Sequence, residues 1–171
     1  MPTKKRVYWD ACVFISYFDK TPSRIVTIDD LLAQSKSGDL EIVTSTLSIV
    51  EVAFNIAERT AGLIPQVVAD MDAFWRDTDV VTLIEPSVPI ARQARSLIRY
   101  AMDNKLKKIR CPDATHLASA QNTGCVEIHS YNFADFDYLK GHTGIPAMDP
   151  YLTQTSLGLP PAPPPGTGGT T

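Results

Sequence analysis

Four carboxylates and one amide fall next to the predicted ends of strands or starts of helices, where side chains can converge. The five residues are Asp10, Glu51, Asp113, Asn132 and Asp135. Several carboxylates in one pocket repel one another and raise each other's pKa. A hard divalent cation such as Mg²⁺ or Mn²⁺ relieves that repulsion, because it prefers oxygen ligands and accepts a phosphate into its shell. The chemistry open to these residues is therefore metal-assisted reaction at a phosphate.

Each of these residues also has a purely structural explanation, which must be weighed beside the chemical one. The structural roles are a helix N-cap for Asp10, a capping box for Ser48-x-x-Glu51, a favourable helix dipole for Asp113 after Pro112, and turn formation for Asn132 and Asp135. These roles explain the residues one at a time. They do not explain why the acids gather at one predicted end of a sheet.

Strands and helices alternate along the chain, which predicts the framework that would gather them. The pattern of apolar residues predicts strands at residues 6–9, 40–45, 79–85, 126–130 and near 146–148. It predicts helices at residues 11–18, 23–38, 47–62, 65–75, 87–105 and 113–124. Alternation of this kind is typical of an α/β fold with a short parallel sheet between helices, an α/β/α sandwich. In such sheets the site lies beyond the carboxyl ends of the strands.

The chain of 171 residues is long enough for one domain, which we place at residues 1–150. Residues 151–171 form a tail rich in Pro, Gly and Thr, which we expect to be disordered because it offers little to bury.

Composition narrows the function further. The net charge of −3 does not by itself indicate a nucleic-acid partner. No apolar run in the sequence is long enough to span a membrane. Three scattered cysteines fit neither a zinc site nor a disulfide framework and favour a reducing, cytoplasmic setting. Glycine-rich phosphate loops of nucleotide-binding proteins are missing from the sequence.

Four sequence blocks resemble those of PIN-domain nucleases, in the family's order. They are "VYWDACVFI", "TSTLSIVEVAF", "CPDATHLASA" and "HSYNFADF", and the likeness covers roughly residues 6 to 149. The third block, similar to the family's D-A-x-h-L-A-x-A helix, is the most specific. The compact single-domain form resembles the toxin ribonucleases of VapBC toxin–antitoxin pairs.

The resemblance implies a PIN-like fold and a Mg²⁺- or Mn²⁺-dependent endoribonuclease that hydrolyses RNA through a metal-activated water. By the same resemblance Asp10, Glu51 and Asp113 bind the metal. The fourth position departs from the family, because Asn132 stands where many relatives carry Asp. Asp135 then supplies the missing charge, and Asn132 orients a carboxylate or a water. The partners implied are an RNA substrate, a cognate antitoxin and a second copy of the chain in a homodimer.

Other residues fit an RNA substrate. Arg92, Arg95 and Arg99 share one face of a predicted helix and lead toward Asp113, either as a track for phosphates or as a solvated surface. Ser45 is a further candidate for an RNA contact, with helix capping as the alternative.

His116 lies three residues after Asp113, so two roles stay open for it. It either shares a metal with Asp113 or packs in the core beside the site. The second role is favoured, because the sequence brings no other histidine or cysteine toward it.

Two rival functions remain open from the sequence. The first is a PIN-like module that binds RNA or protein without cutting it. The second is a phospho-acceptor domain, for which the sequence offers neither a pair of acids after the first strand nor a late lysine.

Overall fold

The computed structural model describes residues 4–53 and 65–152. The end of the helix predicted at residues 47–62 and nearly all of the predicted tail lie outside the described residues. Within the described helices, no segment is both long and apolar enough to cross a bilayer.

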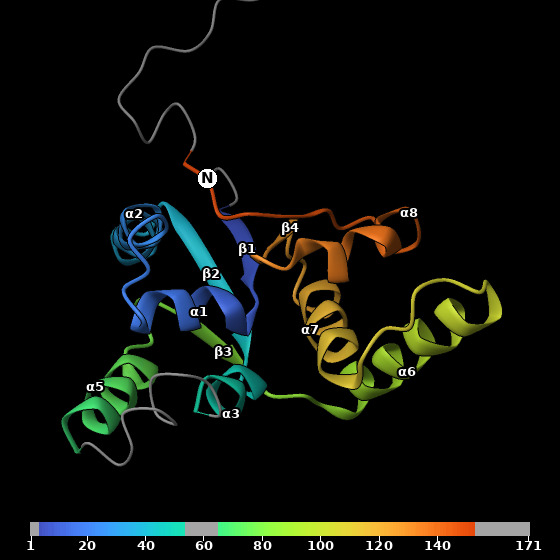
Figure 1. Cartoon of the computed structure of the whole chain (residues 1–171), viewed down its shortest axis with the longest axis horizontal. Helices are drawn as coiled ribbons and strands as arrows, with labels where there is room; N and C mark the ends of the chain where they lie inside the picture. The colour runs from blue at the N-terminus through green and yellow to red at the C-terminus, as the bar shows by residue number, and fades with distance from the viewer. Residues whose placement is uncertain (1–3, 54–64, 153–171) are drawn as a thin grey trace, which may run out of the picture.

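A parallel sheet forms the centre of the molecule (Figure 1). In the part of the chain that the structure describes, this sheet has five strands. The strands are β1 (Lys5–Trp9), β2 (Leu40–Ser45), β3 (Thr82–Ile84), β4 (Glu127–His129) and β5 (Ala147–Met148). They lie in the order β3-β2-β1-β4-β5, with Tyr8 of β1 in register with Val43 on one side and Ile128 on the other. Because every pair is parallel, the carboxyl ends of the strands meet at one edge.

Helices connect the strands. They are α1 (Ala11–Phe18), α2 (Ile25–Ser37), α3 (Leu47–Ala53), α5 (Pro65–Arg76), α6 (Val88–Asp103), α7 (Cys111–Asn122) and α8 (Lys140–Thr143). Gly38 ends α2 with φ of 90°, a conformation that glycine adopts without steric cost. Two 3₁₀ turns, η1 (Phe133–Asp135) and η2 (Asp137–Leu139), precede α8, and the sequence pattern did not predict any of these three short elements.

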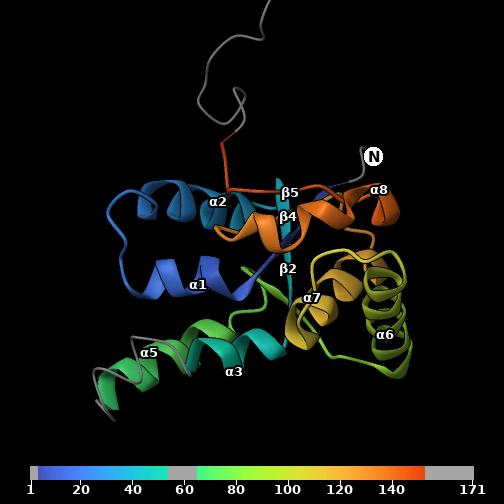
Figure 2. The same cartoon turned by 45° about the vertical axis from the view of Figure 1, so that its right-hand side comes forward.

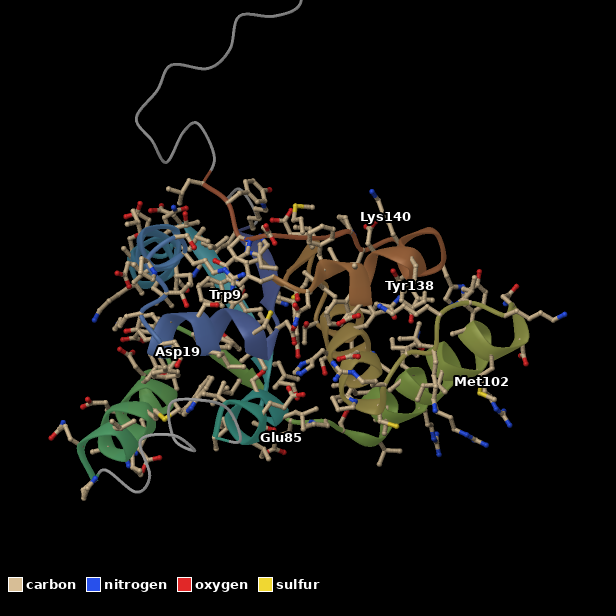
Figure 3. The ribbon with its side chains drawn as sticks, in the orientation of Figure 1. Trp9, Asp19, Glu85, Met102, Tyr138 and Lys140 are labelled. Carbon is tan, nitrogen blue, oxygen red and sulfur yellow. The ribbon has the colours of Figure 1, made fainter. Side chains whose placement is uncertain are left out.

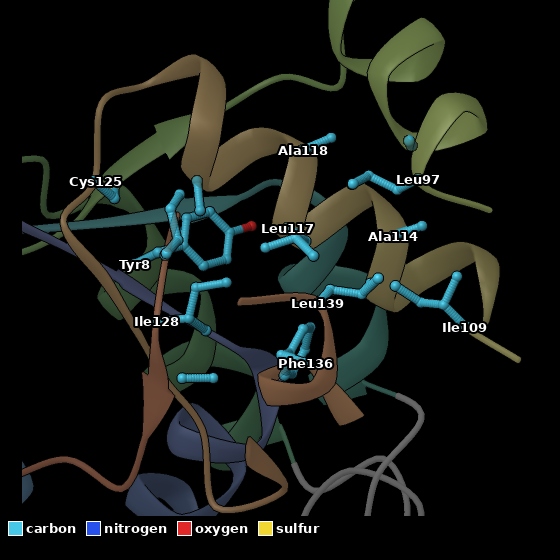
Figure 4. Close-up of a cluster of buried hydrophobic side chains, with 14 of the residues drawn as sticks. Tyr8, Leu97, Ile109, Ala114, Leu117, Ala118, Cys125, Ile128, Phe136 and Leu139 are labelled. Atoms are coloured by element: carbon cyan, nitrogen blue, oxygen red, sulfur yellow. The ribbon is translucent and has the colours of Figure 1, made fainter. Parts of the chain in front are cut away.

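One face of the sheet packs against α6 and α7 (Figure 4). Tyr8, Val43 and Ile128 point to this side and are at most 1% exposed. Leu97 of α6 and Leu117 of α7 meet them in the same cluster. Strand residues alternate between faces, so the neighbours of these residues point to the opposite side.

The other face is covered by α1, α2 and α5 (Figure 2). Trp9 of β1 packs on Phe14 of α1, with ring centroids 5.4 Å apart, and Phe14 packs on Trp75 of α5 at 4.9 Å. Tilted aromatic pairs of this kind add about 1 kcal/mol each beyond the area they bury. Helices on both faces confirm the α/β/α sandwich that the sequence predicts.

Candidate metal centre

A cleft of about 420 Å³ opens at the carboxyl edge of the sheet. Its lining consists of Asp10, Ala11, Cys12, Ile15, Val50, Glu51, Arg110, Asp113, Asn132 and Asp135. All five residues predicted to hold a metal are therefore on its wall. Side-chain oxygen and nitrogen atoms gather in the region between α1, α3 and α7 (Figure 3).

Asp10 directly follows β1 and caps α1. Its extended backbone (φ −76°, ψ 157°) places Oδ1 2.8 Å from the Ala11 amide, which donates to it. The Ser130 hydroxyl donates to Oδ2 at 2.9 Å, and the Cys12 thiol lies 3.2 Å from the same atom. The capping role is thus real, but it uses only one oxygen and leaves the carboxylate on the cleft wall.

Cys12 is held in its neutral form beside that carboxylate. Burial, together with the charge of Asp10, raises the pKa of the Cys12 thiol to about 12. A protonated thiol can donate to Asp10, whereas a thiolate would repel it. Cys12 therefore orients Asp10 without adding to the negative charge of the cleft.

Glu51 lies on α3 and is fixed by a histidine. His116 Nε2 on α7 lies 2.6 Å from Glu51 Oε2 and 3.7 Å from Asp10 Oδ1. The Tyr8 hydroxyl contacts His116 Nδ1 at 2.7 Å and accepts a hydrogen bond from the Ser45 amide at 2.8 Å. Since that hydroxyl can donate to Nδ1, the hydrogen of the neutral ring sits on Nε2 and faces Glu51.

Contacts with the acids raise the pKa of His116 even though its side chain is fully buried. Burial by itself lowers the pKa of His116, but the hydrogen bond to Glu51 and the nearby charge of Asp10 outweigh it and raise the pKa. In both protonation states Nε2–H faces Glu51.

The capping box predicted at Ser48-x-x-Glu51 is not formed. Ser48 is the second residue of α3, and its hydroxyl lies 2.7 Å from Thr44 Oγ1. Ser45 takes part in the start of the helix instead, because its hydroxyl accepts from the Leu47 amide at 3.2 Å. Ser45 is also fully buried, so the structure does not expose this candidate RNA contact to a substrate.

Asp113 lies in the first turn of α7, two residues into a helix that begins at Cys111 and carries Pro112 next. Both carboxylate oxygens are engaged by one arginine: Arg110 Nε donates to Oδ2 at 2.8 Å and Nη2 donates to Oδ1 at 3.0 Å. The Asp113 side chain is 10% exposed, whereas that of Arg110 is 71% exposed. Asp113 therefore both interacts favourably with the dipole of α7 and lines the cleft.

Asn132 directly precedes the first 3₁₀ turn beyond β4, and Asp135 is the last residue of that turn. The backbone N–H of Asn132 donates to Ser130 Oγ at 3.0 Å, and the same Ser130 hydroxyl donates to Asp10. Asp135 Oδ1 pairs with Lys107 Nζ at 2.6 Å. Asp135 is thus already paired with a lysine, which is not among the described residues of the cleft lining.

One group of side chains has the geometry of a metal site. Oxygen atoms of Asp10 and Glu51 and a ring nitrogen of His116 all lie within 4.8 Å of one another. Two carboxylates fit Mg²⁺ or Mn²⁺, and Asp113 reaches the same cleft from α7. The sequence favoured a core position for His116, and it is fully buried, yet its Nε2 reaches the acids.

The sequence placed Arg110 in a basic run leading toward Asp113, but it did not predict that Arg110 pairs with Asp113, nor the roles of Tyr8 and Cys12. A signal existed for the pairing of Arg110, because the residue just before a helix lies close to the residue three positions later in the first turn. Tyr8 and Cys12 carried no such signal, because their partners His116 and Ser130 are more than 100 residues away in the sequence.

The basic residues of α6 form a separate exposed surface. Arg92, Arg95 and Arg99 are all exposed, while the apolar residues between them face α7. At the cleft itself, positive charge comes from Arg110 in the lining and from Lys107, which pairs with Asp135.

A five-strand parallel sheet between helices, with acids gathered at its carboxyl edge, is the arrangement of a PIN domain. The PIN domain profile matches residues 7–139, and the chain belongs to this family. No curated protein sequence matches the chain.

Solved structures with this fold include several toxins. The Rickettsia felis VapBC2 complex, bound to a DNA fragment from its promoter, has a TM-score of 0.65 at 13% identity and covers 84% of this chain and 98% of its own. VapC20 of Mycobacterium tuberculosis, a toxin that cleaves the sarcin–ricin loop, has a TM-score of 0.57 at 18% identity, covering 73% and 88%. A toxin–antitoxin complex of Klebsiella pneumoniae has a TM-score of 0.56 at 21% identity, covering 85% and 98%. At these identities the likeness establishes the fold.

Proposed function

We propose that the chain is a Mg²⁺- or Mn²⁺-dependent endoribonuclease, with residues 1–150 as its nuclease domain, acting in the cytoplasm as the toxin of a toxin–antitoxin pair. The observation that carries this proposal is the convergence of Asp10, Glu51 and Asp113 on one cleft, from three different elements. A structural role explains each acid alone, but it does not require that they share a cavity. Membership of the PIN family supports the same conclusion.

Asp10, Glu51 and Asp113 would hold the cation, with Asn132 or Asp135 completing the set. The donor atoms of Asp10 and Glu51 are already close enough to share one ion. A bound divalent cation lowers the pKa of its water and stabilises charge on a reacting phosphate. No residue of the cleft is needed as a covalent nucleophile.

The surrounding residues serve to orient the acids. Ser130 and Cys12 hold Asp10 from one side, and His116 holds Glu51 from the other. Hydrogen bonds of this kind around metal-binding carboxylates fix their rotamers and typically affect metal affinity or activity 10- to 100-fold. His116 acts here as a positioning residue, through Glu51.

A polyanionic substrate must approach a protein with a net charge of −3. The exposed Arg92, Arg95 and Arg99 of α6 supply a local positive surface for the RNA backbone. Contacts to phosphates of this kind do not read sequence, so they support binding to RNA in general rather than a particular target.

An antitoxin and a second copy of the chain are the protein partners we propose. A complex of a toxin with its antitoxin, from Klebsiella pneumoniae, is among the structures that share the fold. A toxic ribonuclease needs such a partner to be held inactive.

The test is cleavage of a mixed RNA pool by the purified chain, with Mn²⁺, with EDTA, and with EDTA followed by excess Mn²⁺. We expect cleavage in the first and third conditions and none in the second. Binding of RNA without cleavage in any condition would contradict the proposal and favour a PIN-like binding module.

A further inference from the structure

Arg110 stands out among the residues that line the cleft, because it alone carries a positive charge in the described lining. Four carboxylates share that lining: Asp10, Glu51, Asp113 and Asp135. Asp135 has its own partner in Lys107. Arg110 is therefore the residue of the described lining that can attract a second anion, such as a phosphate, to a cleft that is otherwise negatively charged.

The Arg110 guanidinium makes a planar, two-point contact with Asp113. Nε and Nη2 each donate to a different carboxylate oxygen, at 2.8 and 3.0 Å. This is the geometry with which arginine also binds a phosphate, whose oxygens have similar spacing. The contact that Arg110 makes with Asp113 is thus one that it can make equally with an RNA backbone.

The two members of the pair differ in their freedom to move. Asp113 is built into the first turn of α7 and its side chain is 10% exposed, so its position is set by the helix. Arg110 precedes the helix, has an extended backbone (φ −78°, ψ 155°) and a side chain that is 71% exposed. Arg110 can leave Asp113 by rotating its side chain, without any change in the fold.

A divalent cation on Asp113 would weaken this pair. The cation and the guanidinium are like charges that compete for the same carboxylate, and their mutual repulsion is strong at contact distances. An arginine displaced from Asp113 stays charged at every relevant pH and remains at the rim of the cleft. There its N–H donors can bind another anion.

We propose that Arg110 binds the phosphate of the RNA bond to be cleaved, exchanging Asp113 for that phosphate when Asp113 takes up a divalent cation. The inference rests on the proposed nuclease function and adds one residue to it. In the free protein Arg110 then competes with the cation for Asp113. In the complex with metal and RNA it binds the substrate phosphate. The same residue lowers metal affinity and raises RNA affinity.

This dual role predicts opposite effects for a single substitution. In Arg110→Gln the competing charge is gone, so calorimetric titration with Mn²⁺ alone should show tighter binding, by about 3- to 10-fold. Cleavage of RNA should show a raised KM and a kcat lowered by about 100-fold, because the phosphate loses its two-point ligand. Arg110→Lys keeps the charge without the planar fork and should recover only part of kcat.

A matched control is available on α5. Arg76 pairs with Asp72 at 3.5 Å, its side chain is 77% exposed, and it does not line the cleft. Arg76→Gln makes the same change of charge by removing an arginine–aspartate ion pair outside the cleft, and it should alter neither Mn²⁺ affinity nor cleavage. Urea unfolding of all three variants shows that each is folded.

The outcomes separate the two proposals. An active wild-type protein whose Arg110→Gln variant binds Mn²⁺ no more tightly, or cleaves RNA with unchanged kcat and KM, overturns the role of Arg110 and leaves the nuclease standing. A wild-type protein that binds Mn²⁺ but does not cleave RNA overturns the nuclease itself. Tighter Mn²⁺ binding together with slower cleavage in Arg110→Gln supports both.

Discussion

His116 Nε2 lies 2.6 Å from Glu51 Oε2, so a buried histidine holds a carboxylate of the cleft. On its other side His116 Nδ1 contacts the Tyr8 hydroxyl at 2.7 Å. Burial raises the pKa of Tyr8, so this hydroxyl stays neutral and can donate. Tyr8 of β1 therefore helps to fix the position of Glu51 through His116.

The first prediction concerns this connection. His116→Ala removes the partner of Glu51, leaves the buried Tyr8 hydroxyl with only its bond from the Ser45 amide, and opens a cavity. It should therefore lower the free energy of unfolding by roughly 2–4 kcal/mol. His116→Gln keeps a donor toward Glu51 and should retain more of both stability and cleavage. Urea unfolding and RNA cleavage measure the two effects.

His142 provides the control for loss of a histidine. It stacks on Tyr100, with ring centroids 3.7 Å apart, and does not line the cleft. His142→Ala should leave cleavage unchanged. Cleavage by a folded His116→Ala variant at the wild-type rate would show that His116 does not position Glu51.

The second prediction concerns acid stability and a different buried carboxylate. Glu127 on β4 accepts from His129 Nε2 at 2.8 Å and pairs with Lys5 Nζ at 2.8 Å. Burial by itself raises the pKa of Glu127, but the contacts with His129 and Lys5 together lower it to about 2. A carboxylate with a lowered pKa stabilises the fold above its unfolded pKa of 4.5, and that stabilisation is lost as the pH falls toward 2.

Glu127→Gln should therefore remove part of the pH dependence. Between pH 5 and pH 3 the wild-type protein should lose about 2 kcal/mol more stability than Glu127→Gln. Urea unfolding at both pH values measures the difference. Glu41→Gln, which breaks the pair with Arg6 at 2.9 Å, should keep the full acid sensitivity of the Glu127 network. Parallel pH profiles of wild type and Glu127→Gln would contradict the explanation.

The third prediction concerns the exposed arginines of α6. Replacing Arg92, Arg95 and Arg99 with Gln should weaken RNA binding across all sequences and reduce the salt slope of binding by about 2, because about three phosphate contacts are lost. Mn²⁺ affinity should hardly change. Fluorescence anisotropy with an RNA oligonucleotide at several salt concentrations measures the slope.

The control makes the same change of charge elsewhere, by replacing Lys20, Lys36 and Arg76 with Gln. If both triple variants lose the same slope, net charge rather than a track on α6 attracts the RNA. If neither does, the α6 arginines are a solvated surface.

Much of the fold follows from the sequence because periodicity and stop signals are local. The strand at residues 40–45 and the stop at Gly38 match β2 and the end of α2. The segment from Asn132 to Gly144 is different, because its 3₁₀ turns and the short α8 depend on packing against the core rather than on a repeating pattern.

In the site, too, some features follow from local sequence patterns and others depend on tertiary packing. The gathering of Asp10, Glu51 and Asp113 at one cleft could be expected from parallel strands whose carboxyl ends share an edge. Partners that meet only after folding, such as His116 with Tyr8, could not be read from spacing. The order β3-β2-β1-β4-β5 likewise depends on tertiary packing.

Asp10 allows the structural and the catalytic explanations of the acid cluster to be separated most directly. Asn is nearly the same shape as Asp and caps helices equally well, so Asp10→Asn should keep the bond from the Ala11 amide and change stability by at most about 1 kcal/mol. What it removes is the charge that a metal site needs. Asp19→Asn, at the other end of α1, is the matched control.

The decisive measurement is the rate of Mn²⁺-dependent RNA cleavage by Asp10→Asn beside wild type and Asp19→Asn. We predict a loss of more than about 100-fold for Asp10→Asn, because a carboxylate of the metal site is gone, and no loss for Asp19→Asn. Cleavage by Asp10→Asn at the wild-type rate would contradict the account and leave Asp10 as a helix cap alone.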